Sequence, residues 1–317
     1  MSTAPLDRLA IVGTGLIGSS IARAAREYGL ARRIAVADAA EGHRAEAAAL
    51  GLADEVHADA ADAVRDADLV MLCVPLGAYA AVAAHIGPAL KAGAIVSDVG
   101  SCKQSVIRDV TPHLPAGVAF VPGHPVAGTE HSGPQAGFAS LFRGRWCILT
   151  PEPGTDPAAV GTVQAFWAGM GSRVEMMEAR HHDLVLAITS HVPHLIAYNI
   201  VGTADDMETV TQSEVIKYSA GGFRDFTRIA ASDPTMWRDV FLNNREAVLE
   251  MLGRFTEDLI ALQRAIRWGE GDALFDLFTR TRAIRRAIID AGQETDAPDF
   301  GRAAAATAAK PAAPKAD

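Results

Sequence analysis

The stretch of residues 9–20, LAIVGTGLIGSS, constrains this chain more than any other part of it. An apolar run of four residues ends in Gly13, Gly15 and Gly18 follow, and the residues after them favour a helix. A strand, tight turn and helix with this spacing form a dinucleotide-binding motif. The first glycine allows the turn, the second lets the backbone approach a pyrophosphate, and the third lets helix and strand pack closely.

A second predicted strand, residues 32–37, leads to Asp38, 20 residues after Gly18. A carboxylate at this position meets the ribose hydroxyls of a dinucleotide. It also repels the 2′-phosphate of NADP, and no arginine follows before Arg44, so we expect the cofactor to be NAD. A glycine-rich turn that binds no ligand is the alternative interpretation.

Strand and helix patterns alternate from residue 8 to 122. The run at 69–74 has no polar alternation, which is typical of a parallel strand covered on both faces. The chain therefore predicts an α/β fold with an open, doubly wound, Rossmann-type parallel sheet. The other strands are expected near 55 and at 94–98 and 118–121, with helices at 41–50, 60–65, 78–90 and 102–113.

Ligands in such a sheet bind at the carboxyl ends of the strands and at the first helix N-terminus, where free N–H groups meet phosphates. The residues that we expect to contact the cofactor are Gly13, Gly15, Leu16, Ile17, Gly18, Asp38, Val74, Pro75 and Ser101. Residues 123–145 are rich in Gly, Pro, His and Ser and predict a functional loop. A strand at 146–149, a helix at 157–170 and a strand near 173 complete this domain.

After residue 175 the pattern is helical only, which predicts an all-α second domain. A helix over 181–203 contains Pro193, where we expect a kink. A second helix over 209–219 is expected to end at Gly221 and Gly222.

Asp233 and Pro234 predict the start of a helix that runs to about Trp268. Its length, roughly 50 Å, is more than a small domain can cover, so a second subunit would cover it in a homodimer. A last helix is expected at 272–291. These patterns divide the chain into a dinucleotide-binding domain (1–175), a helical substrate and dimerisation domain (176–296) and a disordered tail (297–317).

Composition excludes several classes of partner. The 317 residues carry a net charge of −9 without a basic stripe, which argues against nucleic acid. The N-terminus lacks the layout of a signal peptide, and apolar runs such as 69–76 are shorter than the ~20 residues of a membrane span. Cys73, Cys102 and Cys147 are an odd number without metal spacing, and predict packed thiols, no metal site and a cytoplasmic protein.

His124 follows the strand predicted at 118–121, in the crevice where a nicotinamide would lie. Pro125 holds the backbone of His124 extended. An imidazole near neutral pH can accept the proton that an alcohol loses when it is oxidised. A structural histidine in a loop is the other interpretation.

His191 and His194 are three residues apart and share a helix face. A zinc site is disfavoured, because no carboxylate or cysteine stands at a suitable spacing. Packing in the core and contact with a substrate both stay open.

Arg224 and Arg228 also share a face if their segment is helical. Guanidinium groups are the preferred bidentate partners of carboxylates, so a substrate acid is one interpretation. A surface ladder of ion pairs with Asp225 and Asp239 is the other.

Five segments together resemble the prephenate and arogenate dehydrogenases of tyrosine biosynthesis. They are the glycine-rich turn, DVGSCK, GHPVAGTEHSG, SHVPH and GGFRDFTRIAASDPTMWRD, in the expected order between residues 8 and 292. The resemblance implies a dinucleotide-binding domain followed by a helical dimerisation domain.

The resemblance also implies a reaction. NAD takes a hydride from the carbinol carbon of a cyclohexadienol, the ring carboxylate leaves as carbon dioxide, and the ring becomes aromatic. Prephenate then gives 4-hydroxyphenylpyruvate, and L-arogenate gives L-tyrosine; both substrates stay open.

The site residues that the resemblance implies come from both halves of the chain. His124 and Ser101 match the residues that act at the substrate hydroxyl, and Arg228 matches the anchor of a substrate carboxylate. Trp237 matches an aromatic of the pocket, reaching it from the same chain or across the dimer. The other implied substrate contacts are His194, His191, Thr129, Glu130, Asp225 and Arg224, with Glu130, Asp225 and Arg228 in an ionic network at the pocket mouth.

Two other functions stay open. Other two-domain β-hydroxyacid dehydrogenases use a lysine on a helix of the second domain, and Lys217 is the only lysine between Lys103 and Lys310. A catalytically idle NAD-binding sensor is the second, which the presence of His124 and Arg228 disfavours.

Overall fold

Six parallel strands form the central sheet of the protein, in the order β3-β2-β1-β4-β5-β6. The computed structural model describes residues 5–129, 131–211 and 220–290, with the backbone alone for 207–211. The strands are β1 (Leu6–Val12), β2 (Ala31–Ala37), β3 (Glu55–His57), β4 (Leu69–Leu72), β5 (Ile95–Asp98) and β6 (Ala119–Val121). The strand order reverses between β1 and β4, so the predicted doubly wound parallel sheet is confirmed.

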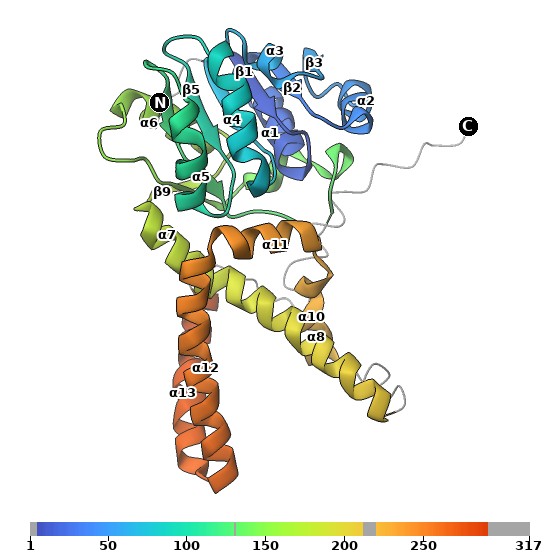
Figure 1. The fold of residues 1–317 in the computed structure, drawn as a ribbon, viewed down its shortest axis with the longest axis vertical. Helices are drawn as coiled ribbons and strands as arrows, with labels where there is room; N and C mark the ends of the chain where they lie inside the picture. The colour runs from blue at the N-terminus through green and yellow to red at the C-terminus, as the bar shows by residue number, and fades with distance from the viewer. Residues whose placement is uncertain (1–4, 130, 212–219, 291–317) are drawn as a thin grey trace, which may run out of the picture. The chain divides into compact units, whose positions relative to one another are not determined.

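Helices cover both faces of this sheet (Figure 1). Leu9 and Ile11 of β1 pack in one apolar core with α1 and α6, whereas Ala10 and Val12 pack in a second core with α4 and α5. Alternate residues of a strand point to opposite faces, so an uninterrupted apolar strand needs both layers. The helices are α1 (Leu16–Glu27), α2 (Glu41–Ala49), α3 (Ala60–Val64), α4 (Tyr79–Ile86), α5 (Lys103–Val110) and α6 (Pro157–Gly169).

Residues 123–145 are not a loop throughout. They begin with the strand β7 (Gly123–Pro125), which pairs antiparallel with β8 (Trp146–Leu149), and β8 pairs parallel with β9 (Arg173–Met176) in a second sheet. Two 3₁₀ turns, Pro134–Ala136 and Ala139–Phe142, follow. The sequence Gly-His-Pro has no strand propensity of its own, and pairing with β8 makes it a strand.

Pro193 is accommodated by a wide turn. Helix α7 (Ala179–Leu186) passes through a π-helical turn, Ala187–His191, into α8 (Val192–Thr211). A proline lacks the N–H that the preceding turn needs, and π-turns are one way in which a helix absorbs such a defect. The distortion therefore lies just before the proline at which the sequence predicts a kink.

The helical segment Ala179–Asp206 contains an 18-residue stretch with a mean hydropathy of 1.5, and the segment could cross a membrane by length and composition alone. A search for uninterrupted apolar runs does not find this segment, because polar residues are spread along it. The segment also carries three buried polar side chains, His182, Asp183 and His191, and such residues are rare in membrane-spanning helices. Its hydropathy is therefore weak support for a membrane span.

Gly221 and Gly222 form the first turn of a helix, α10 (Gly221–Thr227), and whether they also end the predicted one lies outside the described residues. Glycine is a frequent stop signal, but it is also tolerated in a first turn, where few intrahelical bonds have formed. Of the helix predicted over 209–219, residues 209–211 belong to α8, and the rest lies outside the described residues.

The single helix predicted from Pro234 to Trp268 is wrong, because it is broken at Asn244 into α11 (Pro234–Asn243) and α12 (Arg245–Trp268). Its start is as predicted, since the Asp233 side chain accepts the N–H of Met236 at 2.7 Å. At this break the buried amide of Asn244 donates to the carbonyl oxygen of Asp183 at 2.9 Å and so joins the α11–α12 junction to α7.

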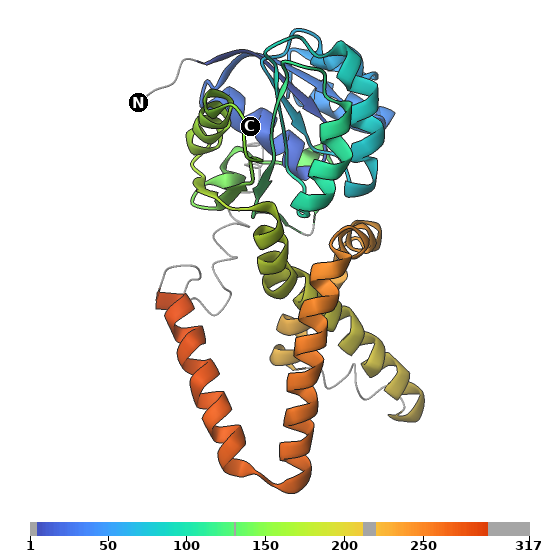
Figure 2. The same ribbon diagram turned by 60° about the vertical axis from the view of Figure 1, so that its left-hand side comes forward.

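The chain divides into two compact units, Met1–Met251 and Leu252–Asp317. The second contains most of α12 and all of α13 (Gly271–Asp290), two rods joined at a turn (Figure 2). Large apolar side chains stand exposed on both: Leu259, Ile260, Ile266, Trp268, Phe275, Phe278, Ile284 and Ile288. The predicted tail, 297–317, lies outside the described residues.

Candidate active site

The glycine-rich turn has the geometry of a phosphate cradle. Gly13 has φ +97°, and a Cβ there would collide with the carbonyl oxygen of Cys73. A Cβ on Gly18 would collide with the carbonyl oxygen of Gly13. Gly15 instead faces open space and begins α1 without a side-chain cap, which leaves the N–H groups of its first turn, at Leu16 and Ile17, for an anion. The residues fit a dinucleotide.

Asp38 directly follows β2, and hydrogen bonds fix both oxygens of its carboxylate. Its Oδ2 accepts the N–H and the hydroxyl of Thr14, both at 2.8 Å, and its Oδ1 accepts the N–H of Ala40 at 2.9 Å. Burial acts to raise the pKa of Asp38, but these hydrogen bonds outweigh it and leave the pKa lowered. Asp38 is thus a fixed negative charge. Arg44 donates to the backbone carbonyls of Asp38 and Ala39.

Val74 and Pro75 follow β4, the strand next to β1, and therefore lie at the reversal of strand order. Val74 is half-buried and Pro75 exposed. Ser101 follows β5 and precedes α5, half-buried, with its Oγ 3.9 Å from the Sγ of Cys102. In the described part of the chain, no hydrogen bond joins Ser101 to His124.

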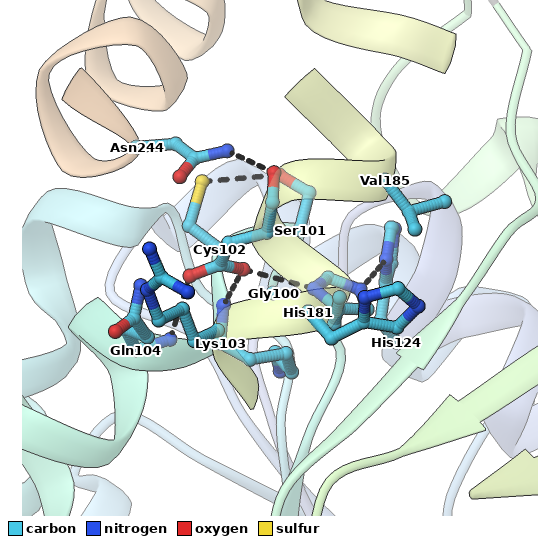
Figure 3. A network of polar contacts seen from close by, with 12 residues as sticks. Gly100, Ser101, Cys102, Lys103, Gln104, His124, His181, Val185 and Asn244 are labelled. Atoms are coloured by element: carbon cyan, nitrogen blue, oxygen red, sulfur yellow. Dashed lines mark hydrogen bonds and ion pairs between the residues drawn. The ribbon is translucent and has the colours of Figure 1, made fainter. Parts of the chain in front are cut away.

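His124 lies on β7 and enters a buried polar network (Figure 3). Its Nδ1 is 2.9 Å from the Nε2 of His182, and the Nδ1 of His182 is 2.9 Å from the Oδ1 of Asp183. The two oxygens of Asp183 accept the backbone N–H groups of Lys103 and Gln104 at 2.7 and 2.9 Å. Asp183 therefore caps the N-terminus of α5 and orients the ring behind His124.

A buried ion pair fixes the residue before His124. The Nζ of Lys103 donates to Oδ2 of Asp98 and to the carbonyl oxygen of Gly123, both at 2.6 Å. Oδ1 of Asp98 accepts the N–H of Gly123 at 3.0 Å. Both charged side chains are 0% exposed. The N–H and the carbonyl group of Gly123 are thus both hydrogen-bonded to buried charged side chains.

The environment keeps His124 neutral. Burial holds the pKa of His124 well below its ordinary value, and the neighbouring His182 and Lys103 lower it further. Burial also lowers the pKa of His182, although Asp183 opposes that effect. A neutral imidazole at physiological pH has one ring nitrogen free to accept a proton.

His191 and His194 meet Trp237 of the same chain. The ring of His194 stacks on Trp237 with centroids 3.6 Å apart, and its Nδ1 donates to the carbonyl oxygen of Ser190 at 2.9 Å. His191 contacts the edge of Trp237 and lies 3.1 Å from the Nδ2 of Asn244. Trp237 is buried, and its Nε1 has no hydrogen-bond partner among the described residues.

Arg228 acts electrostatically on this cluster. Burial lowers the pKa of His194, and the charge of Arg228 lowers it further. Arg224, Asp225 and Arg228 are all exposed. Within the described residues neither arginine forms an ion pair with Asp225 or Asp239, and Asp239 pairs with Arg238 instead.

The remaining predicted residues lie at the edges of the site. Thr129 is exposed, with its hydroxyl accepting the N–H of His131 at 3.3 Å. Glu130 and Lys217 lie outside the described residues. The described chain contains no cluster of three His, Cys, Asp or Glu side chains that could hold a metal ion.

Several residues of the network were not predicted from the sequence. His182 and Asp183 have one signal, since they directly precede the apolar run 184–188 and a His-Asp pair buried with that run needs partners. Lys103 and Asp98 stand in the DVGSCK segment, but nothing local reveals that they pair. Asn244 sits in an unbroken helical pattern and gives no signal.

Comparisons with known proteins agree on one family. Residues 21–176 match the model of the prephenate dehydrogenase nucleotide-binding domain, and residues 178–280 match that of the prephenate dehydrogenase dimerization domain. The cyclohexadienyl dehydrogenase of Zymomonas mobilis is 46% identical over 280 residues, covering 88% of this chain and 95% of that protein. The prephenate dehydrogenase of Bacillus subtilis is 32% identical, covering 89% and 76%.

A solved structure is also similar. Prephenate dehydrogenase from A. aeolicus, in complex with hydroxyphenyl propionate and NAD+, superposes with a TM-score of 0.85 at 34% identity. The match covers 90% of this chain and 100% of that one.

Proposed function

Because the chain belongs to the prephenate dehydrogenase family, we propose that it catalyses the NAD-dependent oxidation and decarboxylation of prephenate, of L-arogenate, or of both. The observation that carries the proposal is the buried imidazole of His124, which lies just after the carboxyl end of β6, is kept neutral by burial and is held through His182. The relative from Zymomonas mobilis is named for cyclohexadienyl substrates, the chemical class that includes both acids.

His124 is the proposed proton acceptor. Its neutral ring accepts a hydrogen bond from the ring hydroxyl of the substrate and takes up that proton as the carbinol carbon is oxidised. Ser101, half-buried at the end of β5, assists at the same hydroxyl. Loss of carbon dioxide needs no further base, because aromatisation drives it.

The glycine-rich turn and Asp38 hold the cofactor in this proposal. Gly13, Gly15, Leu16, Ile17 and Gly18 bind the pyrophosphate, and Val74, Pro75 and Ser101 lie along the remainder. Asp38 accepts hydrogen bonds from the adenosine ribose, and its charge selects NAD over NADP. When bound, NAD supplies the hydride acceptor.

Substrate recognition falls to the helical half. Arg228 anchors a carboxylate, and its effect on the pKa of His194 supports its place beside that ring. His194 and Trp237 line the pocket, and His191 supports them. The remaining proposed contacts are Thr129, Glu130, Asp225 and Arg224.

We also propose a cytoplasmic homodimer that forms through the helical domain. The exposed apolar side chains of α12 and α13 support it, as does the match to a dimerization domain. In this proposal the dinucleotide-binding domain spans 1–175, the helical domain 176–296 and the tail 297–317. Nucleic acid and membranes are not among the partners.

The test is NADH formation with prephenate and with L-arogenate, each measured with and without L-tyrosine. We expect NAD reduction with at least one of the two acids, together with release of carbon dioxide. No reduction with either acid would contradict the proposal and leave an NAD-binding sensor. Lys217→Met separates the remaining alternative, because a β-hydroxyacid dehydrogenase would lose its catalytic lysine while the enzyme proposed here keeps its turnover.

A further inference from the structure

We propose that His182 and Asp183 are positioning residues that fix the tautomer of His124, so that Nδ1 carries the hydrogen and Nε2 accepts the substrate's proton. The inference rests on the proposed role of His124 as proton acceptor. It assigns the donor and the acceptor in each hydrogen bond of the network, from the N-terminus of α5 to the reacting group.

The direction starts at Asp183. Its Oδ1 and Oδ2 accept backbone N–H groups from Lys103 and Gln104, and a backbone N–H can only donate. The same Oδ1 lies 2.9 Å from the Nδ1 of His182. A carboxylate oxygen in this role is an acceptor, so the Nδ1 of His182 carries a hydrogen.

The next step follows from the neutrality of His182. A neutral imidazole with a hydrogen on Nδ1 has a lone pair on Nε2. This Nε2 lies 2.9 Å from the Nδ1 of His124, which must therefore donate. His124 is left with an unprotonated Nε2. His182 and Asp183 are fully buried, so bulk water offers no alternative partner.

Proton uptake at Nε2 preserves every bond of this network. The proton of the substrate hydroxyl moves to Nε2 of His124, and the hydrogens on Nδ1 of His124 and of His182 stay where they are. The positive charge then lies one ring away from the carboxylate of Asp183, which stabilises it. The opposite tautomer would offer the substrate a donor in place of a base.

The main chain of Asp183 fixes the tautomer of a second histidine, His191, and this tautomer is the opposite of that of His124. Its carbonyl oxygen accepts the Nδ2 hydrogen of Asn244 at 2.9 Å, which determines the orientation of that amide. The other hydrogen on Nδ2 then points to the Nδ1 of His191, 3.1 Å away. His191 therefore accepts at Nδ1 and carries its hydrogen on Nε2. One residue thus supports an acceptor at His124 and a donor at His191.

The experiment compares His182→Leu with His182→Gln, which keeps a carbonyl oxygen able to accept from His124. His181→Leu is the matched control, because His181 is the exposed neighbour on the same helix. Each variant is measured for kcat, KM, NAD affinity and thermal stability. Side-chain ¹⁵N NMR of the protein without substrate reports which nitrogen of His124 is protonated.

In the unaltered protein we expect the Nδ1–H form of His124. His182→Leu should shift His124 towards the Nε2–H form and lower kcat by about 10–100-fold, with KM and NAD affinity within about twofold. His182→Gln should recover most of the kcat and the Nδ1–H form, and His181→Leu should change neither.

Three results would overturn the inference: an Nε2–H His124 in the unaltered protein, an unchanged tautomer in His182→Leu, or an unchanged kcat in that variant. If His182→Leu does not fold, the spectrum of the unaltered protein and the His182→Gln variant still decide it. Because the spectrum needs no substrate, an absence of dehydrogenase activity would refute the proposed function alone.

Discussion

The imidazole of His194 stacks on the indole of Trp237 at a centroid distance of 3.6 Å and an interplanar angle of 23°. The contact joins α8 to α11 within one chain, so Trp237 reaches the predicted pocket without crossing to a second subunit. His191 meets the edge of the same indole and reaches Asp183 through Asn244. A continuous series of contacts therefore connects His194, whose pKa the charge of Arg228 lowers, with the base proposed at His124.

The first prediction concerns His124. His124→Asn removes the proton acceptor but keeps a small polar side chain, so turnover should fall by roughly a hundredfold or more. NAD affinity should stay nearly unchanged, because the cradle lies on other strands. Steady-state NADH formation and titration with NAD measure the two effects, and near-normal turnover would refute the role.

Arg228→Gln tests the carboxylate anchor. Loss of a charged hydrogen-bonded pair should weaken substrate binding by on the order of 2–4 kcal/mol. The apparent substrate constant should therefore rise about 30- to 1000-fold. Arg238→Gln is the matched control, since Arg238 is exposed and pairs with Asp239. Equal substrate constants in the two variants would count against Arg228.

Asp38→Asn tests the cofactor choice. The amide keeps an oxygen for the hydrogen bonds from Thr14 but removes the charge that repels a 2′-phosphate, and Arg44 stays beside it. The ratio of kcat/KM for NADP to that for NAD should rise at least about tenfold. Asp38→Glu, which retains the charge, should keep the preference for NAD. If both variants behave alike, the charge of Asp38 does not set selectivity.

The buried pair of Lys103 and Asp98 should be essential for stability. Lys103→Met leaves the Asp98 carboxylate buried without its counter-charge and should lower the free energy of unfolding by about 3–5 kcal/mol. Adding Asp98→Asn removes that charge, so the double variant should lose less than the sum of the two single losses. Urea unfolding of the three variants checks this, and strict additivity would argue against the coupling.

Stability should fall in mild acid. Burial lowers the pKa of His191 to about 4 and also lowers the pKa values of His182 and His194. These histidines have a pKa near 6.5 in the unfolded chain, so between about pH 7 and 4 the unfolded state binds more protons than the folded state. The free energy of unfolding should decline as the pH falls from about 7 towards 4, by up to about 1.4 kcal/mol per pH unit for each such ring.

The pH dependence can be assigned by substitution. His191→Gln should reduce the slope between pH 6.5 and 4, and above pH 7.5 its slope should match that of the unaltered protein. Denaturant unfolding at several pH values measures it. An unchanged slope below pH 6.5 would show that His191 does not titrate as its burial requires.

The parts of the fold that could be predicted are those with local causes. Gly13 and Gly18 stand where any side chain would collide with backbone, so their spacing indicates the turn directly. The central strands follow from apolar runs that only two covering layers can bury. Asp233 and Pro234 mark a helix start by capping alone.

The parts that could not be predicted depend on distant contacts. Strand β7 exists because of its pairing with β8, from which 20 residues separate it in the chain. The side chain of Asn244, at the helix break, finds its partner in a carbonyl group of α7. His182 and Asp183 acquire their importance from the start of α5, about 80 residues away in sequence. Apart from the need of the His182–Asp183 pair for buried partners, residue types near these positions carry no sign of these contacts.

The hydrogen bonds from Lys103 and Asp98 anchor Gly123, and with it the start of β7, to buried groups at the end of β5 and the start of α5. The segment that follows β7 can therefore change its residues without moving the base. A scaffold of this kind separates the chemistry that every substrate shares from the surface that tells one side chain from another, so exchange of a keto acid for an amino acid requires new rim residues and no new reaction centre.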